Sequence, residues 1–188
     1  MPIQKPMQSK IFADTDATSA FVRFVVQAQL IRKGWSRRKR AARSRTPRLP
    51  GFHETPDDWM LRHSYRLIGE LIKAGYSHLL DARIQELHIR HAGRFSLEGQ
   101  PFKKGLLAMF GWEVNPPSGV LMKRQRRSEL GNAMAYAFRH GVHPKYLCGF
   151  IKQAGLKLIA EKLKIDYREP GFASESRSAR TSTHSATQ

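Results

Sequence analysis

The chain has 188 residues, with 33 lysines and arginines against 15 aspartates and glutamates, and a formal net charge of +18 at pH 7. This length predicts a single domain with its own core, and the one cysteine excludes an intramolecular disulfide and a cysteine-based zinc module. Because no apolar run has the length of a membrane span or a signal peptide, we expect a soluble, cytoplasmic protein.

The positive charge is unevenly distributed. Residues 1–50 contain 12 basic and 2 acidic side chains, residues 51–100 contain 6 and 7, and residues 101–150 contain 8 and 2. Such an excess implies an anionic partner, and nucleic acid is the commonest one. The two basic blocks, Arg32–Arg48 and Lys123–Lys152, surround a charge-balanced segment. This arrangement favours binding through two surfaces, or through one composite surface, over a diffuse cationic shell.

Residues 1–15 are expected to form a flexible N-terminus, and residues 16–50 a helix followed by an arginine-rich segment. Thr15 or Asp16 can cap the helix, which should run to about Lys33, with Gly34 at the C′ position. Apolar residues recur there at helical spacing: Ala20, Phe21, Phe24, Val25, Ala28 and Ile31.

The run from Arg32 to Arg48 contains no acidic residue. We interpret it as a phosphate-binding segment whose contacts do not depend on base sequence. A lipid or acidic-protein surface and a solvated linker are the alternatives. Trp35, beside the run, can stack on a base or anchor the run to the core. The candidate nucleic-acid-binding residues of this segment are Arg37, Arg38, Lys39, Arg40, Arg43 and Arg45.

Residues 51–168 are predicted to form a helical core. Thr55 as N-cap, Pro56 at the first position and two aspartates in the first turn mark the start of a helix that Gly75 ends. A second helix should start after Ser77, and the pair reads as a scaffold hairpin. Further helices are predicted over residues 102–110, about 120–139, 144–153 and 156–163, with a disordered tail over residues 169–188. The fold class is therefore mainly α.

The segment 131–155 resembles the helix-turn-helix of phage-repressor-type DNA-binding proteins. The matching pattern is a small residue, a glycine four positions later, and apolar residues at fixed offsets, here Ala137, Gly141, Val142, Leu147 and Phe150. The resemblance implies that the second helix presents an outward face to DNA. The alternative is an ordinary helical hairpin with a glycine turn. The candidate contacts are Lys123, Arg124, Arg126 and Arg127 before the motif, and His143, Lys145, Tyr146, Lys152 and Gln153 within it.

A second resemblance covers two shorter pieces. Residues 95–107 and 146–155 are similar to parts of the ProQ/FinO family of RNA chaperones, which are small basic helical proteins that bind RNA stem-loops. The family's downstream Arg-x-Asp-Leu stretch is absent from this chain. The resemblance implies RNA as an alternative ligand.

The sequence contains no catalytic motif that we can identify, and no cofactor is expected. The histidines match no metal-binding pattern, and carboxylates are scarce in the basic blocks, although an Mg²⁺-dependent nuclease needs several of them. Cys148 is interpreted as a small buried residue.

The sequence thus favours a nucleic-acid-binding protein, most simply a DNA-binding regulator of transcription or an accessory factor of a mobile element such as a plasmid. A homodimer and a larger nucleoprotein assembly are both open as its form of association. A basic RNA-binding protein or ribonucleoprotein subunit is the alternative, and a small nuclease is the second alternative.

Overall fold

The computed structural model describes residues 15–43, 54–87, 97, 99–110 and 122–171. Within these ranges it contains helices and no strand, which confirms the mainly α fold. None of the described helices combines the length and the apolar character needed to cross a bilayer. The elements are α1 (Thr15–Arg43), α2 (Pro56–Lys73), α3 (His78–Leu87), α4 (Pro101–Phe110), α5 (Arg124–Arg139), the 3-10 helix η2 (Pro144–Tyr146), α6 (Leu147–Ala154) and α7 (Ile159–Lys164).

Helix α1 continues to Arg43, so the prediction that it ends near Lys33 was wrong. Gly34 lies inside the helix, where the Trp59 side chain of α2 packs against it. A Cβ atom on Gly34 would come within 2.6 Å of Cη2 of Trp59, so the glycine makes room for this ring and does not end the helix. The buried stripe of α1 runs past this point through Phe24, Ala28, Ile31 and Trp35. The described part of the arginine-rich segment, residues 32–43, is therefore entirely helical.

The start of α2 agrees with the prediction from its sequence. The hydroxyl oxygen of Thr55 accepts a hydrogen bond from the backbone N–H of Asp58 at 3.0 Å, and Pro56 occupies the first helical position. Gly75 follows the helix with a φ of +79°, a conformation that glycine adopts without strain. Local sequence thus sets both ends of α2, but the predicted scaffold hairpin is not formed, because α3 packs against α4 and not along α2.

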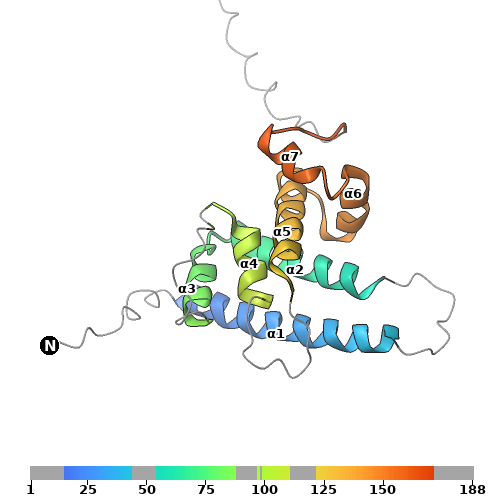
Figure 1. The fold of residues 1–188 in the computed structure, drawn as a ribbon. Coiled ribbons are helices and arrows are strands. Elements are labelled where there is room, and N and C mark those ends of the chain that lie inside the picture. The colour runs from blue at the N-terminus through green and yellow to red at the C-terminus, as the bar shows by residue number, and fades with distance from the viewer. Residues whose placement is uncertain (1–14, 44–53, 88–96, 98, 111–121, 172–188) are drawn as a thin grey trace, which may run out of the picture.

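Helix α2 lies at the centre of the fold and contacts α1, α4, α5, η2 and α6. In Figure 1, α1 and α2 run alongside each other, and α5 rises from them toward α6 and α7. The close packing of α2 on α4 depends on Gly105, since a Cβ atom there would meet Ile68 at 2.5 Å. The largest fully buried side chains are Tyr136, Phe24, Met60, Ile68, Leu79, Leu80, Leu106, Met109, Met134, Leu147 and Ile159.

A buried hydrogen-bond network joins α5, α7 and the chain that follows. The Glu169 carboxylate accepts hydrogen bonds from the Tyr136 hydroxyl at 2.9 Å and from the Lys162 ammonium at 2.6 Å. Burial, the largest single effect, would raise the pKa of Glu169, but these two hydrogen bonds, together with the charges of Lys162 and His140, outweigh it and lower the pKa. Glu169, the first residue of the predicted tail, is only 8% exposed. The helical core therefore extends to this residue.

His140 completes the network in one tautomeric form. Its Nε2 accepts a hydrogen bond from the backbone N–H of Glu169 at 3.0 Å, and its Nδ1 lies 2.7 Å from the carbonyl oxygen of Tyr136. Because Nε2 faces a donor and Nδ1 faces an acceptor, the neutral ring carries its proton on Nδ1. The imidazole thus connects the end of α5 to the residues that follow α7.

Candidate nucleic-acid interface

The second half of α1 is the first candidate surface, and Trp35 anchors it to the core. Trp35 is 5% exposed, and its ring packs edge-on against Phe110 with centroids 5.4 Å apart. Its indole N–H donates a hydrogen bond of 2.9 Å to Asp57 at the start of α2. Of the two roles that the sequence left open for Trp35, the structure shows the anchoring role. Trp35 thus joins the second half of α1 to the start of α2 and to α4.

Four arginines project from this anchored segment into solvent. Within the described residues, none of them pairs with a carboxylate. Arg38 lies over the ring of Trp59, 4.7 Å from its centroid. Lys39 differs from the arginines, because it pairs with Asp57 at 3.3 Å and lies over the ring of Trp35. Arg45 lies outside the described residues. The exposed arginines are Arg37, Arg38, Arg40 and Arg43.

Lys33, Arg37 and Arg40 form a row along one exposed face of α1, which we call the α1 row. Their spacing of four and three residues places them on one side of the helix, over a length of roughly 10 Å. Like charges at such spacing destabilise an isolated helix by roughly 0.2–0.5 kcal/mol per pair. A polyanion bound along the row would remove this unfavourable term.

The second group lies at the start of α5. Lys123, Arg124 and Arg126 are exposed, and Arg126 lies 3.8 Å from Glu129. Arg127 is partly buried and donates a hydrogen bond of 2.8 Å to the carbonyl of Met122. The first turn of α5 contains no acidic residue. Since cations at a helix N-terminus oppose the helix dipole, helix stability does not explain this cluster.

The turn between α5 and α6 has the local geometry that the sequence predicts. Gly141 has a φ of +64°, and the N–H of Val142 donates a hydrogen bond of 3.0 Å to the carbonyl of Ala137. Pro144 opens η2, which leads directly into α6. The four apolar residues of the pattern, Ala137, Val142, Leu147 and Phe150, are all buried. Other helical hairpins with a glycine turn share these features.

The outward side of η2 and α6 is the third group, which we call the α6 face. All its side chains are exposed, and Tyr146 retains 62% of its accessible surface. The Lys145 ammonium lies 5.7 Å from the centroid of the Tyr146 ring. Gly149 has no atom within 4 Å of its ideal Cβ position, so this part of the face is open. The α6 face consists of His143, Lys145, Tyr146, Gly149, Lys152 and Gln153.

Helix α2 separates the first group from the third. Its Trp59 side chain contacts α1, whereas the backbone carbonyl of Asp58 lies 3.7 Å from Sγ of Cys148 in α6. In Figure 1 the start of α2 lies between the end of α1 and α6. Glu54, Asp57 and Asp58 place negative charge at this position. The α1 row and the α6 face are therefore two surfaces, while the α5 group lies on a helix that packs against α4 and α7.

Among the described residues near these surfaces, no side chain has the lowered pKa of an activated nucleophile. Burial, with a smaller contribution from Asp58, raises the pKa of the Cys148 thiol to about 12. The thiol is thus protonated at neutral pH, as expected of a small packing residue. In the described ranges, no three histidine, cysteine or carboxylate side chains are arranged so that they could hold a metal ion. Burial also lowers the pKa of His63, and three nearby arginines, Arg38 among them, lower it further.

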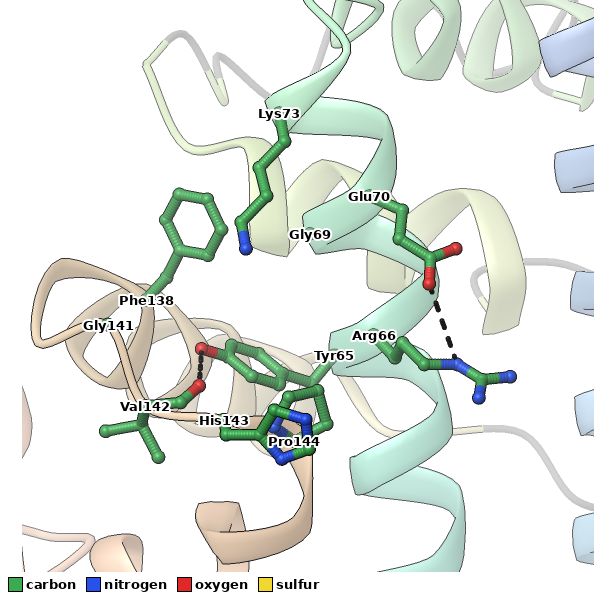
Figure 2. A pocket seen from close by; sticks show the side chains of 10 residues that line it. All are labelled: Tyr65, Arg66, Gly69, Glu70, Lys73, Phe138, Gly141, Val142, His143 and Pro144. Carbon is green, nitrogen blue, oxygen red and sulfur yellow. Dashed lines mark hydrogen bonds and ion pairs between the residues drawn. The ribbon is translucent and has the colours of Figure 1, made fainter.

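A pocket of about 530 Å³ adjoins the turn and was not predicted from the sequence. Helix α2 forms one wall, and the end of α5 with the following turn forms the other. Figure 2 shows the Lys73 ammonium directed into the space between Phe138 and Tyr65, while Arg66 and Glu70 point away from it. Helical spacing places Arg66 and Lys73 on one face of α2, but nothing in the sequence places the turn against that face.

No protein-family model, curated protein or solved structure matches this chain.

Proposed function

We propose that the protein binds nucleic acid, with duplex DNA favoured, as a regulator or as an accessory factor of a mobile element. The observation that carries this proposal is the α1 row, whose exposed cations pair with no carboxylate among the described residues and whose helix is anchored through Trp35. A flexible linker or an unanchored tail would not hold cations at fixed spacing. Anchored cations favour a polyanion with regularly spaced phosphates. Contacts to phosphates do not depend on the base sequence of the nucleic acid.

The α6 face supports duplex DNA as the ligand. It follows a tight left-handed turn at Gly141 and exposes two lysines, a tyrosine and a glutamine. These residue types make phosphate and base-edge contacts, and the gap at Gly149 allows a close approach of another molecule's backbone. The short helix is backed by Leu147 and Phe150, so it is a firm platform for such contacts.

A substitution pair tests the α6 face. Lys145→Ala with Lys152→Ala should weaken binding to a fluorescent DNA duplex about tenfold, because two charge-assisted contacts are removed. Lys157→Ala is the matched control, since this exposed lysine lies beyond α6. Fluorescence anisotropy measures the affinity, and circular dichroism checks the fold. Unchanged affinity of the double variant would refute a role for this face.

The α1 row is tested by the dependence of affinity on salt. Arg37→Ala with Arg40→Ala should reduce the slope of log affinity against log salt by about 1.8, which is roughly 0.9 for each lost phosphate contact. The loss should be the same for unrelated DNA sequences. A competition between duplex DNA and a structured RNA at matched salt tests the preference for DNA, and tighter binding of the RNA would contradict it.

A further inference from the structure

The pocket between α2 and the α5–η2 turn has the properties of a ligand site. Its volume of about 530 Å³ lies in the ordinary range for small-molecule pockets, roughly 300–1,000 Å³. Phe138 supplies a partly exposed aromatic wall, whereas the Tyr65 ring beside it is only 4% exposed. The Phe138 ring is fixed by edge contact with Phe102 at 5.3 Å, and the Tyr65 hydroxyl donates a hydrogen bond of 2.8 Å to the carbonyl of Val142. The apolar part of the site is therefore preorganised.

The charges of the pocket leave one cation available to a ligand. Arg66 lies 3.8 Å from Glu70, so its charge is offset within α2. The Lys73 ammonium instead lies 5.8 Å from the centroid of the Phe138 ring and pairs with no carboxylate in the described parts of the chain. Figure 2 shows that it points into the pocket. The pocket thus offers a positive charge beside an aromatic surface.

His143 adds a hydrogen-bond donor at the rim. Its Nδ1 accepts a hydrogen bond from the backbone N–H of Lys145 at 3.2 Å, so the neutral ring carries its proton on Nε2. The same turn continues into the α6 face, where Lys145 and Tyr146 are exposed. The pocket and the α6 face are therefore adjacent parts of one surface.

From these features, we propose that the pocket binds a single nucleotide, with its base against Phe138 and its phosphate at Lys73. An aromatic wall binds any base through its π-face, and an ammonium binds a phosphate as a point charge. The nucleotide is either free or an unpaired nucleotide of a bound strand. The second source rests on the proposed function, since the strand would cross the α6 face.

Calorimetry with adenosine 5′-monophosphate tests the pocket directly. Lys73→Met should weaken binding about tenfold, while the matched control Lys157→Met should not change it. Glu70→Gln should strengthen binding, because Arg66 loses its partner and the pocket loses a negative neighbour. Lys73 is exposed in the last turn of α2, so its replacement leaves the core intact, as circular dichroism should verify. Absence of wild-type binding to the mononucleotide, together with the result below, would overturn the proposal.

A bulged duplex distinguishes the two sources. If the pocket accepts an unpaired nucleotide, a duplex with a one-nucleotide bulge binds more tightly than the perfect duplex, and Lys73→Met removes this excess. If only the free mononucleotide binds, the pocket is a small-molecule site, which also supports the proposal. If neither the bulge nor the mononucleotide shows Lys73-dependent binding, the proposal is wrong, whatever the affinity for perfect duplex. Mononucleotide binding without any duplex binding would refute the proposed function alone.

Discussion

Two glycines in the turn and in α6 should respond to alanine substitution in opposite directions. Gly141 has a φ of +64°, where an alanine side chain is strained by roughly 1–2 kcal/mol. Gly149 lies in α6 with no positive φ, and its ideal Cβ has no neighbour within 4 Å. Alanine at Gly149 should therefore stabilise the protein by about 0.5–1 kcal/mol through its better helix propensity.

Thermal unfolding followed by circular dichroism measures both effects. For a domain of this size each kcal/mol shifts Tm by roughly 2–4 °C, so Gly141→Ala should lower Tm by several degrees and Gly149→Ala should raise it slightly. The two substitutions add the same methyl group, so each is the control for the other. If Gly141→Ala melts at or above the wild-type temperature, the left-handed turn is absent and the argument for the α6 face fails.

Binding adds an independent measurement at Gly149. If the DNA backbone approaches α6 at this open position, the added methyl group should reduce affinity although the protein is more stable. In this one variant, the effect on the stability of the fold and the effect on the contact with DNA have opposite signs and can be told apart. Equal or tighter binding by Gly149→Ala would show that the ligand does not approach closely there.

Three further predictions concern the core. Trp35→Ala should destabilise the protein by about 3–5 kcal/mol in urea unfolding, because it removes a buried ring and its hydrogen bond to Asp57; a loss below 1 kcal/mol would contradict the anchoring role. The pKa of Glu169 is lowered in the fold, so its contribution to stability is present above the ordinary carboxyl pKa of 4.5 and is lost as the pH falls through the lower folded value. Glu169→Gln should therefore flatten the dependence of the unfolding free energy on acidic pH, and an unchanged profile would count against the network. Cys148, which is partly buried, should react slowly with iodoacetamide at pH 8 and rapidly after unfolding, since its pKa is about 12 in the fold; equal rates would contradict the raised pKa.

Local sequence was a good guide where one short segment decides the outcome. Thr55 and Pro56 mark the start of α2 because a cap needs only its own first turn. Gly141 was interpreted correctly because a left-handed turn is a property of a few consecutive residues. Gly34 was interpreted wrongly, because a glycine that makes room for a side chain of another helix has the same sequence context as one that ends a helix. Only the position of Trp59, in another helix, decides between them.

The missed features all depend on contacts between distant parts of the chain. The pocket joins α2 to a turn that lies some seventy residues later, and no periodicity relates the two segments. Glu169 follows the last helix in a polar stretch typical of a tail, yet Tyr136, His140 and Lys162 bind it. Among the candidate site residues, the exposed cations could be predicted from the sequence. The ion pair between Lys39 and Asp57 could not, because the two residues lie in different helices.

The hydrogen bond from Tyr65 to Val142 has a consequence for the order in which the protein forms. The two residues are 77 positions apart, so during synthesis α2 leaves the ribosome long before the carbonyl that its tyrosine binds. Until then, the side of α2 that later contacts α5, η2 and α6 remains uncovered. Burial of the Tyr65 hydroxyl thus requires the chain to have been made at least as far as the turn, and a nascent chain that ends earlier leaves this side of α2 exposed to solvent.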